Sequence, residues 1–214
     1  MPEISPPASK GARTSQTIVE VAERLWGERG IDAVSLREIS AAAGLSNPAS
    51  VQYHFGGRDQ LVAAIYERRL PAIDARRRYL LDEAFTADAA AGLRTLLSCL
   101  FRPLFEQVDS EGKHSYASFL RQVLQFAPAA RLREQSMHLT PATAELLRLI
   151  DGATPDMPPA LAAHRLIAAN LMMLDVVVKI DREPSELGAE AVFGDTLDML
   201  AAALALPPSL QCSP

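Results

Sequence analysis

Apolar positions recur along most of this chain with the three-to-four-residue spacing of α-helices. Between positions 13 and 29 they fall at i, i+3, i+4, i+7 and i+8, which predicts a helix with one wide apolar face. The residues on that face are Ile18, Val21, Ala22, Leu25 and Trp26. Gly30 predicts its end, because glycine adopts a left-handed cap cheaply. The one strand-like run, 176–178, lies inside a helical pattern, so we expect an all-α fold.

A second, shorter helix is predicted just after this one. Ser35 and Glu38 have the spacing of a capping box, which marks a helix start. Leu36 and Ile39 then begin an apolar stripe on this helix. Gly44 predicts its end and a turn, because a residue without Cβ adopts positive φ at low cost.

A third helix follows the turn. Either Ser46 or Asn47 can cap it, with Pro48 at its first position, where a missing N–H costs nothing. Val51 and Phe55 lie four residues apart and are expected to face inward. Two short helices around a tight turn predict a helix–turn–helix.

The remaining helices are longer and more apolar. Pro71 is expected to kink the first of them, and Pro103 to interrupt the second. The predicted helices are 58–82, 86–107, 114–126, 129–137 and 140–150, followed after a loop at 151–159 by two more around a turn at 181–188. This pattern predicts an N-terminal arm at 1–12, a helix–turn–helix head at 13–57, a larger helical body at 58–208 and a tail at 209–214.

Composition and charge narrow the class of protein. Aromatic residues make up 6 % and hydrophobic residues 49 %, which favours helices. The net charge is −5, yet residues 1–58 hold six basic and six acidic residues, so any nucleic-acid contact must come from a local face. Two cysteines, Cys99 and Cys212, are too few for a disulfide framework or a cysteine metal site. No signal peptide and no membrane-length apolar stretch is expected, which predicts a cytoplasmic protein.

Residues 18–61 resemble the DNA-binding domain of the TetR (tetracycline-repressor-like) family of bacterial transcription regulators. The matching segments are Ile18 and Ala22, 28–30 (ERG), 35–39 (SLREI), 43–46 (AGLS), 53–56 (YHFG) and 58–61 (RDQL). In one respect the chain departs from the family, whose members usually have the phenylalanine ten residues after the turn glycine. Here Phe55 is eleven residues after Gly44, which leaves open the register of the base-contacting face.

The resemblance implies which residues contact DNA. Helix N-termini, hydroxyls and cations bind phosphates, whereas forked or short polar side chains contact base edges. The expected phosphate contacts are Ser35, Tyr53, His54 and Arg58; the expected base contacts are Gln52 first, then Arg37, Asn47, Ala49 and Ser50. Ser35 also caps its helix, and His54 is alternatively a packed imidazole. Lys10 and Arg13 either touch phosphate or belong to a solvated arm.

The body is expected to hold a small-molecule effector if one exists, within residues 86–152. The candidate pocket residues are Phe101, Tyr116, Phe119, Met137 and His138, each of which is alternatively plain core. Few charges need burial there, which favours an apolar or amphipathic effector. The basic cluster Arg68, Arg69, Arg76, Arg77 and Arg78 is interpreted as a solvated helix face.

The two C-terminal helices are expected to form a homodimer interface. Apolar residues recur on both with the same spacing, and two such pairs make a four-helix bundle. The predicted interface residues are Ile167, Leu171, Leu174, Val178, Phe193, Leu197, Leu200 and Leu204. The alternative is that they pack only within their own chain. A dimer presents two heads, which match a palindromic operator on double-stranded DNA.

An enzyme is the main alternative class of function. Glu111 and His114 have the spacing of half a di-iron site, but no second copy exists. No nucleophile elbow, phosphate loop or zinc-protease motif is present. We therefore expect no enzyme, no cofactor and no metal, and a ligand-responsive DNA-binding regulator that represses. The alternatives are an activator of the same fold, or a helical small-molecule-binding protein or enzyme that does not bind DNA.

Overall fold

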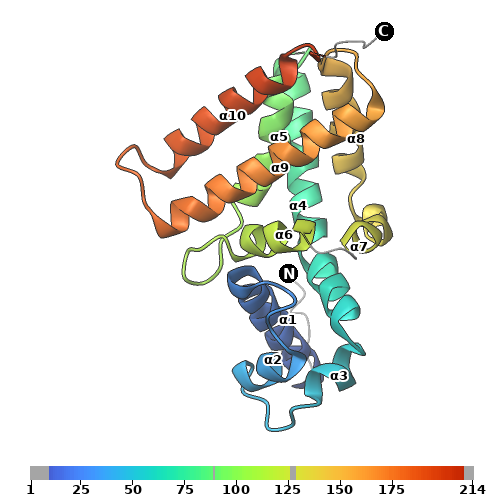
Figure 1. The fold of residues 1–214 in the computed structure, drawn as a ribbon, viewed down its shortest axis with the longest axis vertical. Helices are drawn as coiled ribbons and strands as arrows, with labels where there is room; N and C mark the ends of the chain where they lie inside the picture. Colours follow the sequence, from blue (N-terminus) through green and yellow to red (C-terminus); the bar gives the residue numbers. More distant parts are fainter. Residues whose placement is uncertain (1–9, 89, 126–128, 210–214) are drawn as a thin grey trace, which may run out of the picture.

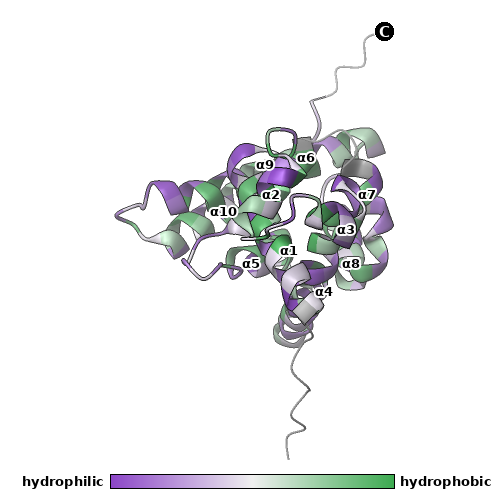
Figure 2. Ribbon diagram, turned by 90° about the horizontal axis from the view of Figure 1, so that it is seen from below, coloured by the Kyte–Doolittle hydropathy of each residue, from purple (hydrophilic) through white to green (hydrophobic). Residues whose placement is uncertain are grey.

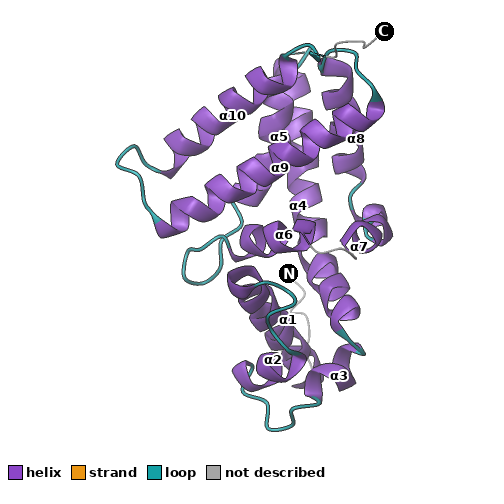
Figure 3. Ribbon diagram, viewed as in Figure 1, coloured by secondary structure: helices purple, strands orange, loops and turns teal. Residues whose placement is uncertain are grey.

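A computed structural model describes residues 10–88, 90–125 and 129–209. Within these ranges the chain forms helices joined by loops, with no strand, which confirms the all-α class (Figure 3). The elements are α1 Lys10–Arg29, α2 Leu36–Ala42, α3 Ser50–Phe55, α4 Arg58–Ala87, α5 Leu93–Phe105, α6 Ser115–Gln125, α7 Ala129–Gln135, the 3-10 helix η1 Met137–Leu139, α8 Pro141–Ala153, α9 Pro159–Arg182 and α10 Ala189–Ala205.

The helices α1, α2 and α3 form a small head at one end of the molecule (Figure 1). The 30-residue helix α4 begins in the head and runs on into the body, where α5, α8, α9 and α10 lie beside one another (Figure 1). Helix α6 of the body lies across the head and packs closely on α1. One hydrophobic core therefore extends from Trp26 in the head through α4 to Leu204 near the C-terminus.

Helix α4 differs from its prediction. It continues through Pro71 to Ala87, so Thr86 lies in its last turn and does not open the next helix. Pro71 lies on an exposed side of α4, where the backbone carbonyl that it leaves unbonded can meet water. Helix α5 begins at Leu93 after Gly92, and it likewise continues through Pro103 to Phe105.

Two other predicted boundaries move. Helix α1 begins at Lys10, so residues 10–12 of the arm predicted at 1–12 are helical, and residues 1–9 lie outside the described part. Helix α8 continues to Ala153, three residues into the predicted loop. Thr154 closes that helix by donating its backbone N–H and its hydroxyl to the Asp151 carbonyl, at 3.2 and 2.9 Å.

The apolar stripe predicted to form a dimer interface lies mostly inside this chain, which contradicts that assignment. The buried members are Leu174, Val178, Phe193, Leu197, Leu200 and Leu204; Leu171 is half-buried and Ile167 is 45 % exposed. Helices α9 and α10 pack on each other and on α6 and α5, respectively. The regular spacing was correct, but it marks the face that covers the chain's own core.

Helix α9 also corrects the expectation that no apolar stretch has membrane-spanning length. Its 24 residues include an 18-residue window of mean hydropathy 1.6, only 28 % of which is buried. By length and composition alone this helix is able to cross a membrane. Its apolar character extends around the helix, since Ile167 and Met172 are exposed while Met173 and Val177 are buried.

Candidate DNA interface and its connection to the body

The capping box at the start of α2 has the predicted geometry. The Ser35 hydroxyl accepts the Glu38 N–H at 3.2 Å, and a Glu38 carboxylate oxygen accepts the Ser35 N–H at 2.9 Å. Arg29 donates to the other carboxylate oxygen, also at 2.9 Å. These hydrogen bonds, those from Ser35 first, lower the pKa of Glu38 to about 2. Glu38 thereby ties the end of α1 to the start of α2.

This lowered pKa predicts acid sensitivity of the head. A carboxylate whose pKa is depressed from 4.5 to about 2 stabilises the fold above pH 4.5, and that stabilisation is lost as the pH falls toward 2. We expect the stability difference between wild type and Glu38→Gln to be full near about pH 6 and clearly smaller near about pH 3. Urea unfolding at both pH values measures it. A difference independent of pH would show that the charge of Glu38 contributes nothing.

A turn held by Asn47 precedes α3, within the segment that separates Phe55 from Gly44. The Asn47 side chain accepts the Ala49 N–H at 2.9 Å, and its backbone carbonyl accepts the Ser50 N–H at 3.0 Å and the Ser50 hydroxyl at 2.7 Å. Helix α3 therefore begins at Ser50, two residues later than predicted, and Asn47 caps this turn. Gly56 ends α3 with φ of 81°.

The polar residues predicted to contact DNA gather on α2, α3 and the turn between them. Ser35, Arg37, Asn47, Gln52 and Tyr53 are exposed, and Tyr53 most of all at 86 %. The exposed side chain of Arg37 has no hydrogen-bond or ion-pair partner among the described residues. The Gln52 amide donates to the Gly56 carbonyl at 2.5 Å, so it must leave this bond to contact a base. Ala49 is exposed and Ser50 half-buried.

His54 and Arg58 are both held by other parts of the head. His54 Nδ1 lies 3.2 Å from the Ser15 hydroxyl of α1. Arg58 donates to Asp32 at 3.1 Å and to the Val34 carbonyl at 3.5 Å. Both side chains are half-buried, so each braces α3 or α4 against its neighbours. Arg37 therefore offers the freer cation on this surface.

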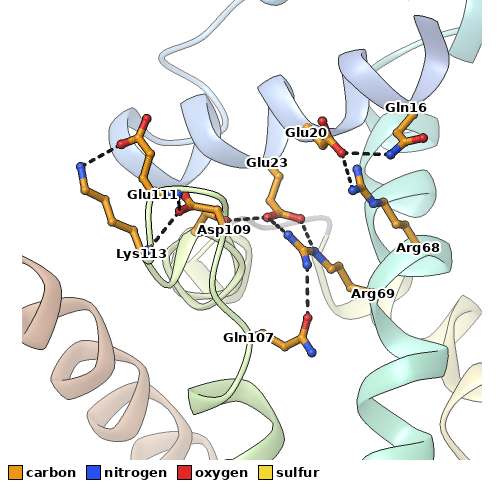
Figure 4. Close-up of polar contacts among 10 residues, drawn as sticks. Gln16, Glu20, Glu23, Arg68, Arg69, Gln107, Asp109, Glu111 and Lys113 are labelled. Carbon is orange, nitrogen blue, oxygen red and sulfur yellow. Dashed lines mark hydrogen bonds and ion pairs between the residues drawn. The ribbon is translucent and has the colours of Figure 1, made fainter. Parts of the chain in front are cut away.

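A buried ion pair connects the head to the body (Figure 4). Glu23 of α1 is 2 % exposed and accepts two hydrogen bonds from Arg69 of α4, both at 2.7 Å. Glu23 also accepts the Ser115 hydroxyl of α6 at 2.8 Å, and Arg69 donates to Gln107 at 3.2 Å. The hydrogen bonds to Glu23, first among the causes, raise the pKa of Arg69. We call Glu23, Arg69, Ser115 and Gln107 the joint.

The basic cluster on α4 was interpreted as a solvated face, but most of its arginines form ion pairs with other helices. Arg68 pairs with Glu20 at 2.5 Å, Arg76 with Glu106 at 2.9 Å, and Arg78 with Glu145. Arg77 is buried. These pairs could not be predicted from the sequence, because each carboxylate partner is 30 or more residues away along the chain.

Close packing reinforces the joint. The ring of Trp26 on α1 stacks on that of Phe119 on α6, with centroids 6.4 Å apart. At Gly27 the two backbones approach so closely that a Cβ would lie 2.9 Å from the Phe119 amide nitrogen. The Gly27 carbonyl accepts the Ser118 hydroxyl at 2.9 Å. The orientation of the head is therefore fixed by polar bonds and by shape.

The five predicted pocket residues are not brought together. Phe101, Tyr116 and Phe119 are fully buried, whereas Met137 is 59 % exposed and His138 lies at the surface. Helix η1, which carries the last two, packs on α4, α7 and α8.

Glu111 and His114 do not face a common metal position. Glu111 pairs with Lys113 at 3.4 Å in the loop before α6. His114 is buried, and its ring nitrogens lie 2.7 Å from Asp181 and 2.9 Å from the Phe105 carbonyl. This histidine links α5, α6 and α9, a structural use that the sequence pattern did not suggest.

Comparison with known proteins agrees with this geometry. Residues 18–65 match the family model described as bacterial regulatory proteins, tetR family. The HTH-type transcriptional regulator BetI of Rhizobium meliloti (strain 1021) is 29 % identical over 193 residues, which cover 88 % of each chain.

Solved structures share the fold across nearly the whole chain. A putative tetR family transcription regulator from Shewanella sp. PV-4 aligns with a TM-score of 0.61 at 16 % identity, covering 91 % of this chain and 99 % of that one. The TetR family regulator PfmR from Thermus thermophilus aligns with a TM-score of 0.53 at 21 % identity, covering 91 % and 97 %.

Proposed function

Because this chain belongs to the tetR family of bacterial regulatory proteins, we propose that it binds a palindromic operator as a homodimer, represses transcription and releases DNA when a small effector binds its body. The observation that carries the proposal is the exposed polar surface of α2 and α3, attached to the body through the buried joint. DNA binding places the protein in the cytoplasm. The proposed domains are a DNA-binding head that ends at residue 57 and an effector-binding body that begins at residue 58.

On the proposed DNA surface, Gln52 contacts a base edge and Arg37 contacts phosphate, with Asn47 and Ser50 as further base contacts. The Ser35 hydroxyl and Tyr53 add phosphate contacts. A glutamine amide pairs with adenine through two hydrogen bonds, which gives sequence preference. A free cation neutralises phosphate and releases counterions whatever the sequence. His54 and Arg58 hold the surface in shape and meet phosphate at its edge.

Two substitutions separate these roles. We expect Gln52→Ala to weaken operator binding by about 1–3 kcal/mol and to leave binding to scrambled DNA nearly unchanged. We expect Arg37→Ala to weaken both about equally and to reduce the slope of log K against log salt by about 1. Fluorescence anisotropy against an operator obtained by random-sequence selection measures both. If Gln52→Ala weakened binding to the operator and to scrambled DNA equally, Gln52 would not be a base contact.

The proposed dimer interface is the outer face of α9 and α10, opposite the buried stripe. Ile167, Met172 and Met199 are exposed there beside small residues such as Ala168 and Ala202. Figure 2, seen from the head end, places α10 on the side of the molecule away from α7 and α8. A partner would cover this face and complete a four-helix bundle. Covering it would also account for the apolar residues that α9 exposes.

Placing a charge on this face tests the dimer. We expect Ile167→Glu to convert the protein to monomers and to weaken operator binding by at least about tenfold, because one head alone makes half of the contacts. Analytical ultracentrifugation gives the mass. Met137→Glu, at an exposed methionine on η1, is the control and is expected to leave the mass unchanged. A dimer that persists in Ile167→Glu would place the interface elsewhere.

The direction of regulation is tested with a reporter gene. A repressor lowers expression from its operator, and loss of the protein raises it; an activator does the reverse. Failure of the folded dimer to select any DNA sequence would favour a helical binding protein or enzyme instead.

A further inference from the structure

A cavity of about 680 Å³ opens between the C-terminal half of α8, the loop that follows it and the N-terminal half of α9. It lies at the end of the body away from the head (Figure 1). Its volume is within the range of small-molecule sites, which is about 300–1,000 Å³. The five residues predicted from the sequence to form an effector pocket all lie outside its lining. The cavity therefore offers a ligand space that the sequence pattern did not indicate.

Much of the cavity wall is apolar. Ile150 of α8 and Leu204 of α10 are buried there, whereas Leu147, Met157 and Leu166 are half-buried. An apolar wall of this kind holds the hydrocarbon part of a ligand, because contact with it removes apolar surface from water. This part of the cavity therefore fits an aliphatic or aromatic frame.

Two arginines bring positive charge to the wall. Arg165 of α9 is half-buried, and its Nη1 donates to the Leu206 carbonyl at 2.5 Å. Its other guanidinium nitrogens have no hydrogen-bond partner among the described residues. Arg148 of α8 is exposed and has no hydrogen-bond or ion-pair partner in the part of the chain that the structure describes. The Leu206 carbonyl is neutral, so neither arginine has a carboxylate in direct contact.

Two acidic residues, Asp151 and Asp156, line the same cavity. Both are exposed, and water screens the charge of an exposed carboxylate strongly. Among the charged residues of the described lining, only Arg165 is half-buried, so its charge acts where the effective dielectric constant is lower. Arg165 therefore dominates the electrostatic preference of the cavity, which is for an anionic group.

We propose that this cavity between α8 and α9 is the effector site, and that the effector is an organic acid with an apolar frame. The frame packs on Leu147, Ile150 and Leu166, and the carboxylate binds the Arg165 guanidinium, with Arg148 as a second cation. A guanidinium donates to a carboxylate in a fixed fork geometry, which gives both affinity and orientation. This inference rests on the proposed function, since it names the site and the chemical class of the effector.

Helix α8 connects this cavity to α4 and so to the head. At the start of α8, the buried Asp74 carboxylate of α4 accepts the N–H groups of Ala142 and Thr143 at 2.9 and 2.8 Å. Arg77 of α4 donates to the Thr143 hydroxyl at 2.8 Å. Leu147 of the cavity wall follows Thr143 by one helical turn. A ligand that shifts α8 therefore acts on α4, which continues into the head.

Binding measured without DNA tests this inference separately from operator binding. The probes are octanoate and 4-phenylbutanoate, each compared with its uncharged primary amide by calorimetry on the full-length protein. We expect at least one acid to bind about tenfold more tightly than its amide. Arg165→Gln is expected to remove most of this preference, and Arg148→Gln, which keeps the Leu206 contact, to reduce it. Arg182→Gln, at an exposed arginine of α9 outside this lining, is expected to leave it unchanged.

Filling the cavity provides a second test. The lining positions 159, 162, 163 and 166 recur at helical spacing, so they form one face of α9. Ala163 on this face is exposed, and Ala163→Trp is expected to weaken acid binding by at least about tenfold because the indole occupies the ligand's space. Ala160, also exposed, lies off this face, so Ala160→Trp is the matched control and is expected to bind the acid normally.

Three results would overturn the proposal. The first is equal affinity for acids and amides, or acid binding that Ala163→Trp leaves intact. The second is loss of the dimer in Ala163→Trp by analytical ultracentrifugation, which would mean that the partner subunit occupies the cavity. The third concerns the operator: saturating acid is expected to weaken operator binding by at least about threefold, and an acid that binds without this effect is not an effector. Operator binding by the ligand-free samples shows in each case whether the DNA-binding proposal stands.

Discussion

Replacing Glu23 with alanine is expected to lower the free energy of unfolding by about 3–5 kcal/mol, because the change leaves the largely buried Arg69 guanidinium without its carboxylate. The Ser115 hydroxyl loses its acceptor in the same step. The loss is larger than for a surface pair, because the Arg69 side chain is only 17 % exposed and water compensates its unpaired charge poorly. Urea unfolding followed by circular dichroism measures it.

Glu28→Ala is the matched control on the same helix. Glu28 pairs with Arg24 at 3.5 Å, and both side chains are about half exposed. Exposed pairs of this kind contribute little, so we expect a change below about 0.5 kcal/mol. Similar losses for the two variants would mean that the joint is no stronger than an ordinary surface ion pair.

Gly27→Ala is expected to destabilise the protein by about 1–3 kcal/mol, although alanine favours a helix over glycine by about 1 kcal/mol. The added Cβ would lie 2.9 Å from the Phe119 amide nitrogen and 3.1 Å from the Ser118 Cβ. Because the nearest contact is backbone, α1 and α6 must separate, and the joint and the Trp26–Phe119 stacking are strained with them. Thermal unfolding measures the change.

Gly194→Ala in α10 is the control for Gly27→Ala. It also lies inside a helix, and a Cβ there would meet nothing within 4 Å. This variant is expected to be stabilised by about 0.5–1 kcal/mol. If both glycine substitutions stabilise the protein, then α1 and α6 are free to move apart, and the head is less firmly attached than the packing indicates.

The sequence predicted those features that depend on neighbouring residues. The capping box of Ser35 and Glu38, the turn at Gly44 and the apolar face of α1 are all set within a few residues, and the structure contains them. The start of α3 was misplaced because two polar residues could cap it, and only the geometry shows that Asn47 caps a preceding turn. Pro71 was expected to kink α4, but the effect of a proline depends on which side of the helix faces water, and Pro71 lies on an exposed side. Pro103 lies buried inside α5, which continues through it.

Features that depend on distant residues could not be predicted. Glu23 and Arg69 each look like surface charges until α1 and α4 are brought together. The spacing of Leu197 and Leu200 indicated an apolar face on α10 but not what covers that face, since a periodic pattern is the same whether its partner is its own chain or another. The burial of the Tyr116 hydroxyl, without a hydrogen-bond partner among the described residues, likewise depends on how distant helices pack.

Helix α4 runs without interruption from the head into the body and, at 30 residues, is about 45 Å long. Helix α6 of the body covers the apolar side of α1, including Trp26. The head consequently does not form an independent module: cut off at residue 57, it would expose the surface that α4 and α6 normally cover. Chimeric regulators that join this head to another body should therefore fold only when α6 and the first half of α4 are transferred with it.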